Sequence, residues 1–341
     1  MQASTASVML HLSRPNIAGK PPINLAKIKK LPSFSVGDKQ DVGEIDNYLK
    51  HFGFMPVSSG APTTLSSNKI VVGKDTSTAL KAFQQFFSLK VDGTFGPQTR
   101  EAMSESRCGL PDLLQSADFS VAGPWDKRHL KYAFGALSRQ PQITADVIKA
   151  AVRRALNTWA SSGVDLTFEE VATTADPDFV IEWRPAQDPD HSMVGGIIAH
   201  ADFPPPYSLH VDKPPLPLHF DDDEHRWVDG AVADGLDIET VALHELGHIL
   251  GLYHSTDPGA VMYPTIGKNL KRRALQLDDK QGVRNLYPSW QFLGGLWSGK
   301  SPRSRYHTLF SNLYSALHRC SSRVCPRRTR AGRCFCSERQ E

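Results

Sequence analysis

The body of the chain has almost no cysteine, which limits how the fold can be stabilised. Of five cysteines in 341 residues, Cys108 stands alone, and the others lie at 320, 325, 334 and 336. Secreted domains stapled by disulfides place cysteines throughout the fold. A disulfide-stapled core is therefore excluded, and the length instead predicts two folded units that each bury a hydrophobic core.

Long apolar runs are missing as well. No run approaches the ~20 residues that span a bilayer, so we expect no transmembrane segment. The first 20 residues have no basic start, and Ser, His and Arg interrupt their apolar stretch, so no recognisable signal peptide is present. The net charge of +3 hides an asymmetry, because residues from 288 onward hold ten Lys/Arg and two Asp/Glu, against 29 and 34 before them. We expect no nucleic-acid partner.

Periodicity divides the N-terminal third. Residues 1–41 mix Pro, Ser, Lys and Gly without a repeat, which predicts a disordered leader. Residues 42–105 then predict a small helical bundle: Ile45, Tyr48 and Leu49 recur at helical spacing, residues 79–86 repeat the pattern, and Thr99 could begin a third short helix. At the other end, residues 289–341 form a basic, cysteine-containing tail that matches no module we recognise.

Residues 119–288 predict an α+β unit. LKYAFGAL, VDLTFEEV and DFVIEWRP have the pattern of strands, and VIKAAVRRALNTWASSG that of an amphipathic helix. The Pro-rich stretch ADFPPPYSLHVDKPPLPLHF predicts a long loop, and ETVALHELGHILGLYH after it predicts a helix. We expect a sheet with helices packed on one face.

The segment HELGH carries the strongest chemical signal. His244 and His248 are four residues apart, so a helix places both imidazoles on one face toward a single tetrahedral ion. Gly251 lets the helix break and brings His254 round as a third nitrogen ligand. A fourth position left open indicates a catalytic zinc site.

Glu245 lies beside the first histidine. A carboxylate there can take a proton from a water on the metal and later deliver it to a leaving amine. These residues predict a zinc-dependent hydrolase with Glu245 as its general base.

The motifs resemble the matrixins, the matrix metalloproteinase family of the metzincin clan. HELGHILGLYHSTDP followed by AVMYP looks like the metzincin zinc helix and Met-turn, and ALKAFQQFFSLKVDGTFGPQTREAM resembles the peptidoglycan-binding-like prodomain of the same family. The resemblance implies a twisted, mostly parallel sheet with long helices, Met262 beneath the ligands, secretion, and polypeptide substrates of the extracellular matrix.

Cys108 lies in RCGLPD, within a linker at residues 106–118. The segment resembles the cysteine switch of the family, whose thiolate occupies the open zinc position and keeps the zymogen latent. Ser106 departs from the family's proline, whereas Arg107 and Asp112, which the resemblance pairs, are present. The prodomain is thus expected to act as an inhibitor, released by cleavage before about residue 119.

The resemblance also implies a structural zinc and calcium ions. His200 and His219 match two zinc ligands, but the loop that should supply the others is shortened to PAQDPDHSMVGG, where His191, Asp190 or Asp188 could substitute. Asp221, Glu224 and Asp178 match calcium positions. The alternative is a solvated polar loop without a metal.

Three hypotheses follow. The first is a latent zinc endopeptidase, which we expect to be a monomer. The second is a glycan- or wall-binding module at residues 42–104 on an inactive protease-like scaffold. The third is a zinc-binding protein whose metal Cys108 saturates permanently. Retention of Glu245 argues against a scaffold, while the sequence does not predict substrate preference or the activating protease.

Overall fold

The computed structural model describes residues 23–40, 42–55, 70–71, 73–113, 122–189 and 191–288. Asp190 and the tail at 289–341 therefore lie outside the described residues, as do residues 1–22 of the expected leader. Within the described ranges, no helix is both long and apolar enough to cross a membrane. Below, residues 23–113 are called the N-terminal bundle and residues 122–288 the sheet domain.

The N-terminal bundle consists of short helices around an aromatic core. Its helices are α1 (Leu25–Lys30), α2 (Gly43–His51), α3 (Lys74–Phe86) and α4 (Pro97–Met103), with β1 (Lys39–Gln40) and β2 (Ile70–Val71) paired antiparallel. The core is built from Tyr48, Phe52, Phe83 and Phe95, all with no exposed surface. Aromatic side chains bury the most area per residue, so a bundle this small can hold together on them.

The disordered leader was a wrong prediction for residues 23–40. Ile23, Leu25, Ile28 and Phe34 are buried, and they join the core of the bundle. Asn24 caps α1, since its Oδ1 accepts a hydrogen bond from Lys27 N at 2.8 Å. The segment is too short to show a convincing helical repeat, which is why its sequence looks irregular.

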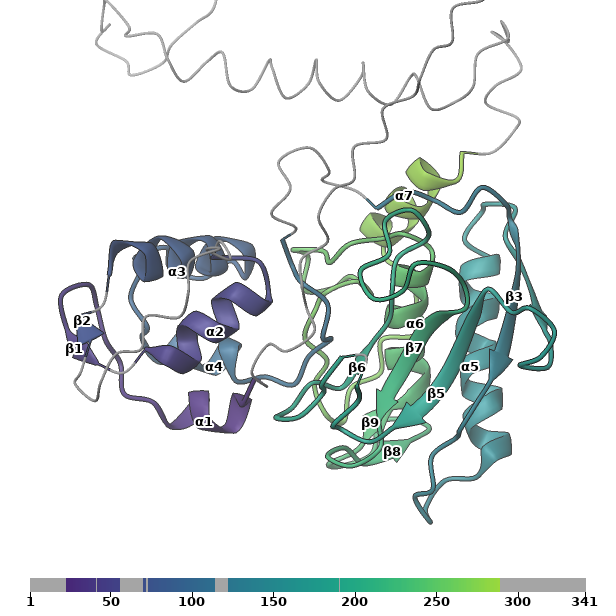
Figure 1. Ribbon diagram of the computed structural model, residues 1–341, viewed down its shortest axis with the longest axis horizontal. Helices are drawn as coiled ribbons and strands as arrows, with labels where there is room; N and C mark the ends of the chain where they lie inside the picture. The colour runs from purple at the N-terminus through teal and green to yellow at the C-terminus, as the bar shows by residue number, and fades with distance from the viewer. Residues whose placement is uncertain are drawn as a thin grey trace, which may run out of the picture. The chain divides into compact units, whose positions relative to one another are not determined.

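The sheet domain contains a five-stranded, mostly parallel sheet. The strand order is β4 (Thr167–Glu170), β3 (His129–Phe134), β5 (Phe179–Arg184), β7 (Leu216–Asp221) and β6 (Ala199–His200), and only β6 runs antiparallel to its neighbour. Helices α5 (Ala145–Ala160) and α6 (Ile238–Ile249) lie against one face (Figure 1), and the main core fills the space between them and the sheet. Beyond the sheet lie β8 (Trp227–Val228), β9 (Leu236–Asp237) and α7 (Leu277–Leu286).

Part of the predicted Pro-rich loop is a strand. Residues 216–221 form β7, which pairs with both β5 and β6 and is buried along its whole length. Pro217 lies inside it and opposite Val180. Proline normally excludes a segment from the interior of a sheet, so the sequence rule failed at this position.

Helix α6 carries the HELGH segment, and every one of its residues is buried. Its N-cap is Asp237, whose Oδ2 accepts a bond from Thr240 N, and Trp159 Nε1 donates to Leu243 O at 2.8 Å. The helix ends at Ile249, and Gly251 follows with a φ of +96°. The predicted break at Gly251 is confirmed, because this left-handed conformation favours glycine.

Candidate functional site

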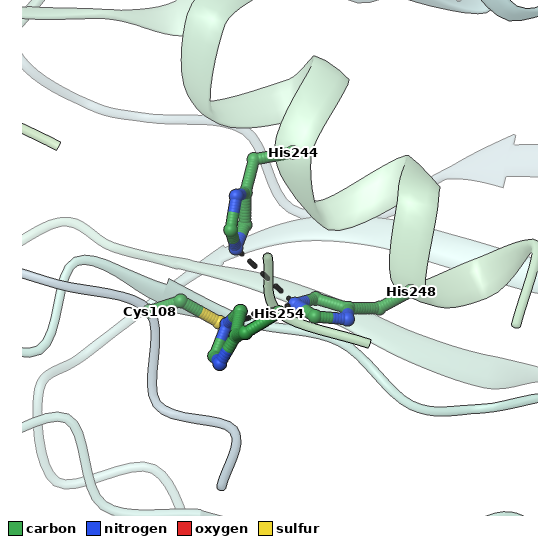
Figure 2. A group of neighbouring side chains, drawn as sticks. All are labelled: Cys108, His244, His248 and His254. Atoms are coloured by element: carbon green, nitrogen blue, oxygen red, sulfur yellow. Dashed lines mark hydrogen bonds between the residues drawn. The ribbon is translucent and has the colours of Figure 1, made fainter. Parts of the chain in front are cut away.

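Three imidazoles meet where α6 ends. Nε2 of His248 lies 3.2 Å from Nε2 of both His244 and His254, and Figure 2 shows the rings turned toward one another with Cys108 beside them. All three side chains are nearly or fully buried. Burial, the largest cause, lowers the pKa of each imidazole well below its usual value, so the neutral form that ligates metals is favoured.

The outer nitrogen of each ring lies close to an oxygen. Nδ1 of His244 lies 2.8 Å from Val261 O, and Nδ1 of His248 lies 2.8 Å from Leu252 O. A carbonyl acceptor at Nδ1 fixes the tautomer that leaves a lone pair on Nε2, so both of these Nε2 lone pairs are available to a metal. Nδ1 of His254 lies 2.7 Å from Asp112 Oδ1 without the geometry of a hydrogen bond. The three Nε2 atoms nevertheless meet in one small buried space.

This donor set fits zinc. Nitrogens about 2.0–2.1 Å from a tetrahedral zinc lie about 3.3 Å from each other, and a thiolate sulfur lies about 3.6 Å from such a nitrogen. The corresponding distances are 3.2 Å between imidazole nitrogens and 3.6 Å from Cys108 Sγ to His248 Nε2. The four ligand atoms form one group of potential metal ligands.

Cys108 lies between the histidines and Glu245. Its Sγ is 3.6 Å from Glu245 Oε2, and the side chain has no exposed surface. Burial and the nearby carboxylate raise the pKa of the thiol well above its usual value. Among the described residues, this is a free cysteine.

Glu245 lies beside this centre, with Oε2 next to Cys108 Sγ. Its Oε1 is buried without a hydrogen-bond partner in the described part of the chain. Burial raises the pKa of Glu245 to about 8, partly offset by the hydrogen bond from Cys108. A buried carboxylate with a raised pKa, facing three convergent imidazoles, has the properties of a general base.

The segment around Cys108 is held as an added strand. Ile198 N donates to Arg107 O and Gly109 N donates to Ala199 O, both at 2.9 Å. On its other side, Cys108 N donates to Pro264 O at 3.0 Å, and Ile266 N donates to Ser106 O at 3.1 Å. Arg107 forms a parallel β-bridge with Ile197 and an antiparallel β-bridge with Thr265. The segment therefore fills a slot between the edge of β6 and the loop after Met262.

Arg107 and Asp112 pair inside the bundle, as the resemblance implied. Arg107 is fully buried, and its NH2 lies 2.5 Å from Asp112 Oδ1. The guanidinium also stacks on Phe52, with Cζ 3.5 Å from the ring centroid, and NH1 donates to Tyr48 OH. Because a buried charge is tolerated only with such partners, the pair fixes the Cys108 segment against α2.

Met262 lies under the histidines, and a residue that the sequence analysis missed positions it. A Cβ on Gly247 would come within 2.2 Å of Met262 Sδ, so the thioether packs directly on α6 between the two ligands. Asp279 of α7 accepts from Val261 N at 2.9 Å and from Met262 N at 3.0 Å. The only available signal was Asp279 itself, an acidic residue in the first turn of an unpredicted helix.

A second group of metal-ligand side chains lies at β6 and β7. Asp188 Oδ2 is 2.5 Å from His219 Nδ1 and 3.4 Å from His200 Nε2, and all three residues are buried. This group holds two of the three predicted zinc residues. The third, His191, lies beside it, with a ring centroid 4.9 Å from that of His200. His210, which was not predicted, is 5.3 Å from His200 by the same measure.

The predicted calcium residues have different surroundings. Asp221 and Glu224 fall in one group with His225, and Asp221 Oδ2 is buried without a hydrogen-bond partner among the described residues. Burial raises the pKa of Asp221 to about 7. Asp178, in contrast, pairs with Lys127 Nζ at 2.6 Å and accepts from Lys131 N, so a lysine already balances its charge.

Comparisons with known proteins show which families and relatives the chain is similar to. The family described as Matrixin matches residues 124–288, and a putative peptidoglycan binding domain matches residues 38–103. Matrix metalloproteinase-25 of Mus musculus is 32% identical over 257 residues, 70% of this chain and 40% of that protein. Matrix metalloproteinase-18 of Xenopus laevis is 34% identical over 254 residues, 73% of this chain and 50% of that protein.

The chain thus spans half or less of these two relatives. Matrilysin of Homo sapiens is 36% identical over 215 residues, which cover 61% of this chain and 75% of matrilysin. The similarity therefore covers most of the length of matrilysin and is not confined to one motif. The chain belongs to the matrixins, the matrix metalloproteinase family.

Proposed function

We propose that the protein is a zinc-dependent endopeptidase made as a latent zymogen. The observation that carries this proposal is the convergence of three buried imidazoles and the Cys108 thiol on one point, with Glu245 beside the thiol. Matrixin membership implies the catalytic zinc. His244, His248 and His254 would hold that ion, with Cys108 as the fourth ligand in the zymogen.

Zinc supplies Lewis acidity when bound, because it lowers the pKa of water to about 7 and polarises a carbonyl. Glu245 then holds the proton: Oε2, which now faces the thiol, would accept it from the attacking water and return it to the leaving nitrogen. Asp279 accepts from Val261 N and Met262 N, and Val261 O lies at Nδ1 of His244, so this turn would keep the first ligand in place.

Substrates would be extended polypeptides. The Cys108 segment uses Ile198 N, Ala199 O and Pro264 O as hydrogen-bond partners, and a substrate strand would use the same backbone groups once that segment leaves. Competition for one slot accounts for inhibition by the prodomain. By family membership, we further propose secretion, action on extracellular matrix proteins, and a monomeric enzyme.

Two supporting ions complete the proposal. Asp188, His200 and His219 offer one oxygen and two nitrogens within one buried group, a donor set suited to a structural zinc. Asp221 and Glu224 are proposed as calcium ligands, supported by the unpartnered Asp221 oxygen. We do not extend calcium to Asp178, because Lys127 occupies its carboxylate.

The test is cleavage of a quenched fluorescent peptide by the full chain, in which Cys108→Ala removes the proposed fourth ligand. Cys108→Ala should be active without treatment, whereas the wild-type chain should need a mercurial or prodomain cleavage. Adding Glu245→Ala or a zinc chelator should abolish activity. A folded, zinc-loaded Cys108→Ala chain that cleaves nothing would instead support the inactive scaffold.

A further inference from the structure

The Gly195 loop, residues 193–197 of the sheet domain, is packed into the core of the N-terminal bundle. Met193 has no exposed surface and Ile197 is 1% exposed, and both belong to the same hydrophobic cluster as Ile23, Leu25 and Ile28. The apolar side chains of the two units thus form one continuous cluster at this point.

The contact is close at the level of the backbone. Leu25 N donates to Gly195 O at 2.9 Å. A Cβ on Gly195 would come within 1.9 Å of Ile23 O, and one on Gly196 within 2.9 Å of Leu25 Cδ1. Both glycines have left-handed φ values, +97° and +110°. Only glycine allows residues 23–25 to approach the loop this closely.

Further hydrogen bonds hold the Gly195 loop and the segment around Leu25 in place within their own parts of the chain. Glu224 accepts from Gly195 N and Gly196 N, with distances of 2.8–3.0 Å, and so fixes the turn. On the bundle side, Lys27 Nζ pairs with Glu44 at 2.5 Å, and Arg100 NH1 donates to Leu31 O at 2.8 Å. Residues 25–31 are therefore tied to α2 and α4 within the bundle, and Leu25 is also bonded to the Gly195 loop.

We propose that the Gly195 loop is a docking surface for residues 23–28, and that this contact holds the zymogen closed in addition to Cys108. The inference rests on the proposed switch role of Cys108. Ile198, immediately after the loop, is hydrogen-bonded to Arg107. Release of residues 23–28 would loosen the strand edge against which the Cys108 segment lies, and Cys108 would become accessible more often.

The experiment measures alkylation of Cys108 by iodoacetamide in the full chain, followed at the peptide level by mass spectrometry so that the tail cysteines are read separately. All chains carry Glu245→Ala, so self-cleavage cannot contribute. Gly195→Ala disrupts the contact from the sheet domain. Gly230→Ala is its matched control, since Gly230 has a φ of +119° and a Cβ there would meet nothing within 4 Å.

Leu25→Pro disrupts the contact from the bundle. Position 25 is the first residue of α1 and Asn24 before it is extended, so proline fits the helix while removing the N–H that Gly195 O accepts. Leu25→Ala keeps that N–H, and should be alkylated more slowly than Leu25→Pro. We expect Gly195→Ala and Leu25→Pro to raise the alkylation rate about tenfold over Gly230→Ala, by loss of a hydrogen bond and apolar burial.

Alkylation of Leu25→Pro at the rate of the parent chain would overturn the inference, even if Gly195→Ala is faster through damage to its own domain. Circular dichroism melting of each variant identifies such damage. The readout is independent of catalysis: an inert enzyme would fail the peptide assay above and leave this comparison of alkylation rates intact.

Discussion

Of the three groups of potential metal ligands among the described residues, the first lies at the end of α6 and the second at β6 and β7. In the first, Nδ1 of His244 and of His248 is hydrogen-bonded to a backbone carbonyl outside the group, so their Nε2 lone pairs face each other. In the second, Asp188 accepts directly from His219. Asp188 gives the second group a carboxylate that hydrogen-bonds within it, whereas the first group contains no carboxylate and its one S–H donor is Cys108, 3.6 Å from His248 Nε2.

The largest expected effect separates the two groups by activity. His248→Ala should lower kcat/KM of the activated chain by about 10³-fold or more, because the centre loses a ligand and the Lewis acid with it. His219→Ala, away from the reacting groups, should change kcat/KM by about threefold at most. Peptide cleavage kinetics with zinc analysis of each variant provide the measurement. Equal losses would mean that the groups do not differ as described.

The second group should matter more for the stability of the fold than for activity. His219→Ala leaves the Asp188 carboxylate buried without its closest partner, which should lower the free energy of unfolding by about 3–5 kcal/mol. The matched control is His129→Ala, which removes an exposed histidine from Glu169 and should have little effect. Urea denaturation followed by tryptophan fluorescence measures both. A small loss in His219→Ala would show that Asp188 is solvated.

The support beneath the first group can be tested at Gly247. Gly247→Ala places a methyl group against Met262 Sδ, and the resulting overpacking should cost about 1–3 kcal/mol of unfolding free energy. Gly267→Ala, where a Cβ would meet nothing within 4 Å, is the control. Thermal melts and zinc retention report the outcome, and identical melts would place Met262 away from the helix.

A substitution at Asp279 should disturb the turn that carries Met262 less than Gly247→Ala does. Asp279→Asn keeps the shape but replaces one acceptor oxygen by a donor, so one of the bonds from Val261 N and Met262 N is lost, at about 1–2 kcal/mol. Asp278→Asn, one residue earlier on the exposed face, should have no such effect. Chemical denaturation of the pair measures the difference, and an unchanged Asp279→Asn would separate α7 from the site.

The smallest effect is expected at Asp178. Asp178→Asn removes a pair with a half-exposed lysine and should cost up to about 1 kcal/mol. It should leave any calcium dependence of the melting temperature unchanged, whereas Asp221→Asn should reduce it. Melting curves with calcium and with a calcium chelator decide this, and a response at Asp178 would restore the calcium ligand predicted from sequence.

Sequence reasoning worked where chemistry and periodicity coincide. The spacing of His244 and His248 follows from helix geometry alone, and Gly251 has the conformation that its position required. It failed where long-range packing overrides local rules. Pro217 lies in an interior strand because β5 and β6 flank it, and Leu25–Lys30 form a helix because the bundle and the Gly195 loop bury Leu25 and Ile28.

The second histidine group shows the same limit. Asp188 was one of several substitutes considered for the missing loop ligands, and nothing in its spacing singled it out from Asp190 or His191. Its selection depends on the closure of residues 186–193, where Met193 N donates to Ala186 O at 2.7 Å. That closure places Asp188 under His219, a tertiary contact that a one-dimensional pattern does not encode.

Asp112 has one further consequence. It is the residue at Nδ1 of His254, yet it lies in the bundle, on the part of the chain that activation would remove. The first two ligands keep their backbone acceptors in the mature enzyme, while the third loses the carboxylate that lies 2.7 Å from its Nδ1. The precursor, which also supplies Cys108 as a potential fourth ligand, should therefore hold zinc more tightly than the mature form.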